Sequence, residues 1–390
     1  MTDLPEKDER QAKADSPIHT SGELSQAQPK PHAQNVSPSP DRQVEGQAEP
    51  QSHSQSVSPI QALADDQPND EIEADDNEAL ERDSAFGDNE SIASSRTSLT
   101  SGITRYRQEN GRRYHAYRDG KYLFPNDEKE QDRLDLFHHV FNLLFGGKLF
   151  HAPVDNPQRV LDVGTGTGIW AIDFADQHPS SHVVGCDLSP IQPGWIPPNL
   201  EFEVDDIEDT WRHKPFNFIH MRMLGGAIKD WEALIAQAYD NLEPGGWLES
   251  VEFEVWVDCQ NDGEVEMPKM IQQWQSLLTE AGERIGRTFI VAVHMKNWME
   301  KAGFVDIRED VIKVPNSPWA KDPRWKEIGA YQQHNMLEAA SAYGQAHFTR
   351  VLGWSPDEFL VLSAEVRKEL KNLKYHLFSN LHIVYGQKPE

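Results

Sequence analysis

The sequence has little cysteine, no long apolar run and almost no aromatic residues in its first 100 positions. Only Cys186 and Cys259 occur among 390 residues, which excludes a disulfide-rich extracellular scaffold, and we expect two reduced thiols. No stretch approaches the ~18 apolar residues of a membrane span, and no basic-then-apolar secretion signal is seen. We therefore expect a cytoplasmic protein without a membrane partner, with the nucleus as the alternative location.

Residues 1–103 differ in composition from the rest of the chain. Positions 1–100 hold one aromatic residue, Phe86, and 7 Lys and Arg against 21 Asp and Glu, which gives −14 of the total charge of −27. So few apolar side chains cannot offset the entropy lost on folding, and the sequence predicts a disordered acidic tail. The acidic excess also argues against direct nucleic-acid binding.

Four Ser-Pro pairs in this tail and a Ser/Thr cluster at 91–101 leave two interpretations open. One is a solvated linker. The other is a phosphorylatable tail that binds regulatory protein partners, because added phosphate changes charge and hydrogen bonding.

Positions 104–150 predict an N-terminal cap segment followed by a helix. Four tyrosines (Tyr106, Tyr114, Tyr117 and Tyr122) lie among arginines and glycines, and Asn126 is typical of a helix N-cap. Apolar residues then recur at helical spacing over 134–145, before two consecutive glycines end the pattern.

The third region, 151–390, alternates between strand and helix patterns. We expect strands at 159–163, 182–187, 200–204, 217–221, 246–257, 305–314 and 380–388, with helices at 170–177, 231–242, 268–281 and 295–302. This order predicts an α/β fold with a doubly wound, seven-stranded, mostly parallel sheet of the Rossmann-like kind. Residues 319–373 break the alternation and predict a helical insertion before the last strand.

A glycine-rich loop is the most informative motif. Residues 159–168 read Arg-Val-Leu-Asp-Val-Gly-Thr-Gly-Thr-Gly, so an apolar strand runs into Gly164, Gly166 and Gly168. Glycines without a Cβ let the backbone approach a ligand closely. The spacing GxGxG differs from the GxGxxG fingerprint of dinucleotide-binding folds, which disfavours an NAD-dependent oxidoreductase. Asp187 ends the next strand, where an acid can accept hydrogen bonds from ribose hydroxyls.

The order and spacing of five features resemble those of class I S-adenosylmethionine-dependent methyltransferases. These features are the glycine loop, Asp187, Asp205-Asp206-Ile207, the strand at 217–221 and the turn at 242–246. The segments 109–139, 166–176, 187–206 and 220–231 are also similar to the LaeA-like methyltransferases of fungi. The resemblance implies S-adenosyl-L-methionine as cofactor, with Asp206 and Ile207 at the adenine and His220 and Met221 near the sulfonium. The implied cofactor-binding residues are Asp162, Gly164, Gly166, Gly168, Asp187, Asp206, Ile207, His220 and Met221.

No residue stands out as a catalytic base, and the weak candidates are His220, Tyr122 and His139. No ligand spacing indicates a metal site. Two hypotheses follow from the motifs and the resemblance. The first is an enzyme that methylates a small molecule in secondary metabolism. The second is a regulatory methyltransferase that controls secondary metabolism or development through protein partners.

Overall fold

The computed structural model describes residues 72–75, 106–118, 120–260 and 265–390. The tail expected to be disordered, 1–103, lies outside these residues except for positions 72–75. In the cap region, strands β1 (Arg107–Glu109) and β2 (Arg112–Tyr114) form an antiparallel hairpin. None of the helices in the described part of the chain has the length and hydropathy needed to cross a bilayer.

A mixed sheet of eight strands forms the centre of the domain. Its parallel half has the order β5-β4-β3-β6-β7, and β10 then runs antiparallel to β7, β8 and β9. The fold is thus the doubly wound, mostly parallel α/β class that the sequence predicts. The strands are β3 (Arg159–Val163), β4 (His182–Asp187), β5 (Leu200–Val204), β6 (Phe216–Arg222), β7 (Leu242–Phe253), β8 (Asp258–Cys259), β9 (Val305–Pro315) and β10 (Leu377–Gln387).

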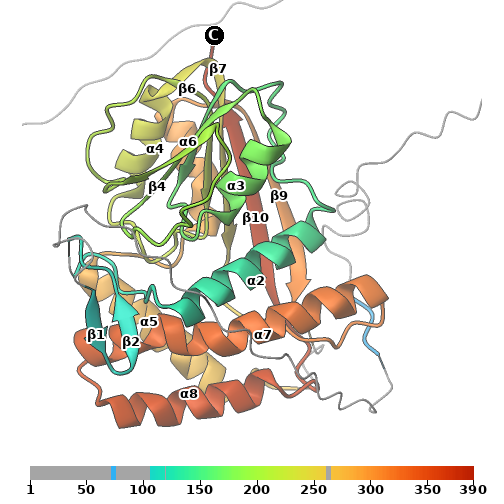
Figure 1. Ribbon diagram of the computed structural model, residues 1–390. Coiled ribbons are helices and arrows are strands. Elements are labelled where there is room, and N and C mark those ends of the chain that lie inside the picture. The colour runs from blue at the N-terminus through green and yellow to red at the C-terminus, as the bar shows by residue number, and fades with distance from the viewer. Residues whose placement is uncertain (1–71, 76–105, 119, 261–264) are drawn as a thin grey trace, which may run out of the picture. The chain divides into compact units, whose positions relative to one another are not determined.

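Helices cover both faces of the parallel half because alternate strand residues point to opposite sides. Val160 and Phe218 pack against α3 (Ile169–Gln177), whereas Leu161 and Ile219 pack in the cluster that holds α4 (Trp231–Asp240) and α6 (Met295–Ala302). Figure 1 shows α3 on one side of the strands and α4 with α6 on the other. The carboxyl ends of β3 to β6 therefore meet at one edge between these layers.

A second helical layer comes from the cap and from the insertion. α2 (Glu128–Leu144) packs along α7 (Pro323–Ala346), which in turn contacts α8 (Pro356–Leu370), while α5 (Lys269–Ile285) contacts α8 (Figure 1). α8 begins with a capping box between Ser355 and Glu358. The expected insertion at 319–373 is thus two long helices joined through a π-helical turn, His347–Val351.

Three local expectations differ from the structure. The N-cap of α2 is Asp127, whose side chain accepts from the Glu130 amide, whereas the Asn126 side chain donates to Ser189. The segment 242–246, expected as a helix end and turn, belongs to β7, with Gly245 at φ 77°. The sheet has eight strands rather than seven because β8, two residues long, pairs with the start of β10. A two-residue strand has no sequence pattern of its own.

Candidate functional site

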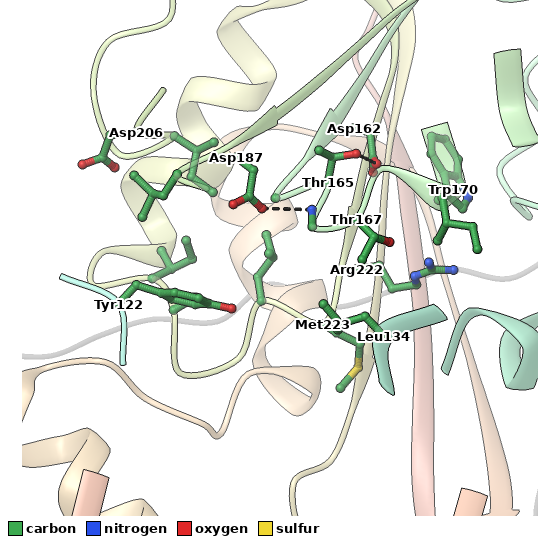
Figure 2. A pocket seen from close by; sticks show the side chains of 18 of the residues that line it. Tyr122, Leu134, Asp162, Thr165, Thr167, Trp170, Asp187, Asp206, Arg222 and Met223 are labelled. Atoms are coloured by element: carbon green, nitrogen blue, oxygen red, sulfur yellow. Dashed lines mark hydrogen bonds between the residues drawn. The ribbon is translucent and has the colours of Figure 1, made fainter. Parts of the chain in front are cut away.

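A cavity opens at the carboxyl ends of β3 to β6, the edge at which open α/β sheets bind ligands. The sheet supplies one wall, and α2 and the cap segment supply the other. Figure 2 shows side chains from these elements around the cavity. Of the residues expected at a cofactor or a catalytic step, the following line it: Asp162, Gly164, Gly166, Asp187, Asp206, Ile207 and Tyr122.

The glycine loop needs its glycines for conformation and for space. Gly164, Gly166 and Gly168 have φ values of 70°, 59° and 82°, in the left-handed region that side chains with a Cβ disfavour. A Cβ on Gly164 would lie 2.4 Å from Cδ2 of Leu224. The amides of Gly164 and Thr165 donate to the carbonyl oxygen of Cys186 at 2.9 and 3.0 Å, which ties the loop to β4. Gly168 lies at the N-cap of α3, outside the cavity lining.

Asp187 ends β4 and lies beside the glycine loop at the cavity. Its Oδ2 accepts from the Gly166 amide at 2.9 Å (Figure 2). Its Oδ1 accepts from the Ser189 amide at 2.8 Å. Burial raises the pKa of this carboxyl to about 6, although both amides act to lower it. A carboxylate oxygen can accept more than one hydrogen bond, so each oxygen still has a lone pair for a ligand hydroxyl.

Asp162, on β3, is occupied mainly by the protein itself. Its Oδ2 accepts from the Thr165 hydroxyl at 2.6 Å, and its Oδ1 lies 2.9 Å from Nδ1 of His220. The His220 ring stacks on Trp170 with a centroid distance of 3.8 Å and an interplanar angle of 3°. Burial lowers the pKa of His220 despite the carboxylate beside it. This neutral imidazole therefore fixes Asp162 and the glycine loop.

Asp206, after β5, is bound by the cap segment. Its Oδ2 pairs with Nζ of Lys121 and lies 3.4 Å from Nη1 of Arg118, while its Oδ1 accepts from the Glu208 amide at 3.1 Å. Burial alone would raise the pKa of Asp206, but the hydrogen bond from Lys121 and the nearby charges bring it below its ordinary value. Ile207 follows and lines the cavity beside it.

The four cap tyrosines separate into two groups. Tyr122 lines the cavity and contacts the rings of His115 and Phe124 at centroid distances of 5.7 and 4.9 Å. Burial raises the pKa of Tyr122 well above 10, so its hydroxyl stays protonated. The other three contact guanidinium groups outside the cavity: Arg113 over Tyr106, Arg118 over Tyr117 and Arg350 over Tyr114.

Besides Gly168, three expected residues lie away from the cavity lining. Met221 is fully buried in the core cluster beneath α4, because the alternation of β6 turns it away from the ligand side. His220 lies behind Asp162, on the side of Trp170. His139 points from α2 to Tyr331 of α7, with a ring centroid distance of 4.7 Å.

The sequence interpretation assigned no role to several residues that do line the cavity. Arg222 and Met223 follow His220 and Met221 at the end of β6, and His138 precedes His139 on α2. Thr167, within the loop, donates its hydroxyl to Asp135 of α2 at 2.7 Å. Helical periodicity could have separated His138 from His139, since Leu134 and Phe141 share its face and also line the cavity. No group of three or more His, Cys, Asp or Glu among the described residues could hold a metal ion.

Comparisons with known proteins agree with this geometry. Residues 136–309 match a family model described as a methyltransferase domain. Methyltransferase pytC of Aspergillus terreus is 45% identical over 300 residues, which cover 76% of this chain and 92% of that protein.

Two further relatives are named as regulators of secondary metabolism rather than as methyltransferases. The secondary metabolism regulator LAE1 of Cochliobolus heterostrophus is 39% identical over 72% of this chain and 94% of that protein. The regulator laeA of Aspergillus fumigatus is 37% identical over 72% of this chain and 76% of that protein. With the cavity at the carboxyl ends of the strands, these matches show that the chain belongs to the LaeA-like family of fungal S-adenosylmethionine-dependent methyltransferases.

Proposed function

We propose that this methyltransferase transfers the methyl group of S-adenosylmethionine to a small-molecule acceptor in secondary metabolism. The observation that carries the proposal is the cavity, in which Asp187 and the glycine loop stand opposite apolar side chains of α2 such as Phe137 and Phe141. A cavity with a few polar groups on one side and aromatic side chains on the other suits a cofactor beside a small apolar molecule. The similarity to a protein named as a methyltransferase, pytC, also supports it.

In this proposal the cofactor lies along the loop, with Asp187 at the ribose and Asp206 with Ile207 at the adenine. The structure fits such a ligand, because the buried Asp187 carboxyl holds one backbone hydrogen bond on each oxygen and can accept two hydroxyl donors. The positive φ values of Gly164 and Gly166 shape the turn of the loop at the cavity, and Leu224 packs where a Cβ on Gly164 would lie. We assign Asp162 to the cofactor's amino group, a contact that must share oxygens already bound by Thr165 and His220.

The cofactor supplies a methyl group already activated on a sulfonium, so the chain's task is chiefly alignment and exclusion of water. Tyr122 provides an aromatic face at the cavity, which attracts a cation. Met221 and His139 lie outside the lining, and we give them no contact with ligand. We assign His220 the role of fixing Asp162 rather than that of a base.

Calorimetric titration with S-adenosylhomocysteine tests the cofactor site. Replacing Asp187→Ala removes the acceptor for the ribose hydroxyls, and we expect at least a ~30-fold loss of affinity, since hydrogen bonds to a charged group contribute about 1.5–3 kcal/mol each. Glu201→Ala is the matched control, because that carboxylate is exposed on β5 near His182. Equal affinities of the Asp187 variant and the wild type would contradict the assignment.

A regulatory role through protein partners is the second candidate. It is supported by the relatives named as secondary metabolism regulators. The match to one of them covers 94% of that protein. Metabolite profiling separates the two when the wild type and the Asp187→Ala variant are returned to a strain that lacks this chain. Loss of one methylated product with accumulation of its precursor supports the enzyme, whereas change across many pathways supports the regulator.

A further inference from the structure

The cavity lining contains three cationic side chains, and two of them are paired with carboxylates. Lys121 pairs with Asp206, and Nη2 of Arg287 lies 2.9 Å from Oε2 of Glu208. Arg222 differs from both. Its hydrogen-bond partner among the described residues is an imidazole nitrogen of His138, and no carboxylate of that part of the chain lies within ion-pair distance.

The Arg222 guanidinium is nevertheless held in a defined position. Its Nη2 lies 3.1 Å from Nδ1 of His138, and because a guanidinium only donates, Nδ1 must be the acceptor. The ring proton of His138 is then on Nε2, which donates to Oδ2 of Asp173 at 2.9 Å. The guanidinium carbon also lies 4.5 Å from the centroid of the Phe141 ring. Residues from β6, α2 and α3 thus converge on this one cation.

Such a cation is unfavourable without a counter-ion. Burial lowers the pKa of Arg222 to about 10, which still leaves it charged at neutral pH. Asp162, Asp173 and Glu249 offset this effect in part, although none of them forms an ion pair with the half-buried guanidinium. Four of its five N–H donors remain after the bond to His138. A bound anion would satisfy both the charge and these donors.

The position of Arg222 indicates which part of a ligand it meets. Figure 2 shows Arg222 near Thr167 and Trp170, on the opposite side of the view from Asp206. With adenine and ribose at Asp206 and Asp187, the far end of the cofactor is its amino acid, which carries a carboxylate. Planar carboxylates match the fork of a guanidinium.

We propose that Arg222 is the carboxylate-binding group of this cavity, with His138 and Asp173 as its positioning residues. The inference rests on the proposed function, since it takes the cofactor orientation from Asp187 and Asp206. The carboxylate comes from the amino-acid end of the cofactor or from an acidic acceptor bound beside it. In either case the imidazole keeps the guanidinium turned toward the cavity.

Calorimetry with two ligands tests the proposal in the full chain. S-adenosylhomocysteine carries the carboxylate, and its decarboxylated analogue keeps the adenosine, the thioether and the amine. Arg222→Gln should lower the affinity for S-adenosylhomocysteine by ~10- to 100-fold, as expected for loss of a charged hydrogen-bonding partner. The affinity for the decarboxylated analogue should be unchanged or higher. Arg222→Lys should give a smaller loss, and His138→Phe an intermediate one with the same ligand selectivity. Arg287→Gln, whose cation is paired with Glu208, should not discriminate between the two ligands.

A second arm distinguishes the source of the carboxylate. Sodium benzoate is titrated into protein saturated with S-adenosylhomocysteine. If Arg222→Gln leaves the affinity for S-adenosylhomocysteine unchanged but abolishes benzoate binding, the proposal holds with an acidic acceptor as the source. Equal loss for both cofactor analogues, or no change in either arm, overturns it. Failure of the wild type itself to bind S-adenosylhomocysteine would instead contradict the proposed function.

Discussion

At the scale of single residues, the buried carboxyl of Asp187 links cofactor binding to pH. Its pKa is raised from 3.8 to about 6 by burial, so the unliganded folded state binds more protons than the unfolded state between these values. This group therefore makes the free energy of unfolding fall as pH rises through that window. Ribose hydroxyls need the ionised carboxylate as acceptor, so cofactor binding must release the proton.

We predict that affinity for S-adenosylhomocysteine falls below pH 6, by up to about tenfold per pH unit, and is constant from pH 7 to 8. Titration calorimetry in buffers of different ionisation enthalpy measures both the affinity and the proton released. Asp187→Asn is the control, since it binds weakly at every pH and should lose the pH dependence between 5 and 7. A wild-type affinity that stays constant down to pH 5 would show that Asp187 does not contact the ligand.

Residue by residue, the sequence predicted those cavity residues whose role follows from a local pattern. Asp187 stands at the end of an apolar strand about twenty residues after a glycine loop, and both features can be read from neighbouring positions. Arg222 could not be assigned in this way. Its partner His138 lies 84 positions away in the sequence, and Asp173 lies 35 positions from His138, between the two. Only tertiary packing brings these three side chains together.

At the scale of elements, the segment 72–75 packs on the helical domain, although it lies within the region expected to be a disordered tail. Ile72 is 5% exposed and joins the apolar cluster that contains Trp319 and Ala320. Ala74 forms an antiparallel bridge with Ala320, and the amide of Lys321 donates to the carbonyl oxygen of Glu73 at 2.7 Å. The segment, drawn in blue in Figure 1, adds a short strand-like contact at the start of the insertion.

We predict that Ile72→Asp detaches this segment and lowers the free energy of unfolding by about 2 kcal/mol, the contribution of burying one large aliphatic side chain. Urea unfolding of the full chain measures the change, and limited proteolysis shows whether the peptide bonds at 72–75 become accessible. Val361→Asp on α8 is the control, because Val361 is 67% exposed. Equal stability of wild type and Ile72→Asp would mean that the contact contributes nothing to the fold.

Elements were predicted well where a local signal sets both of their ends. β3, β4 and β5 have the expected bounds, because each is a short apolar or alternating run closed by glycine, aspartate or proline. The beginning of β7 was missed, since Pro244 and Gly245 normally signal a turn. Here Gly245 adopts a positive φ, and its amide donates to the carbonyl oxygen of Lys388 at 2.9 Å. The segment is thus hydrogen-bonded to the residue that follows β10. That long-range pairing overrides the local preference.

At the scale of the whole molecule, the cap segment, α2 and the sheet edge together line the cavity. The cap is joined to the sheet edge by charge, because Lys121 and Arg118 pair with Asp206, and Arg118 also pairs with Asp209. Its hairpin contacts the insertion through Arg350, which lies 2.8 Å from Glu109. Ion pairs to the sheet edge and to the insertion thus hold the cap at the cavity. We therefore expect ligand release to require opening of the cap.

We predict that Lys121→Glu opens the cap, because it places a carboxylate against Asp206. Dissociation of S-adenosylhomocysteine should then be about 5- to 10-fold faster, a factor typical of losing an ion pair and gaining a like-charge contact. Stopped-flow displacement measures the rate, and amide hydrogen exchange should rise in β1 and β2 of the liganded protein. Lys301→Glu is the control, since Lys301 pairs with the exposed Glu232 between α4 and α6. If Lys121→Glu changed the dissociation rate without raising exchange in the hairpin, Lys121 would act on the ligand directly rather than through the cap.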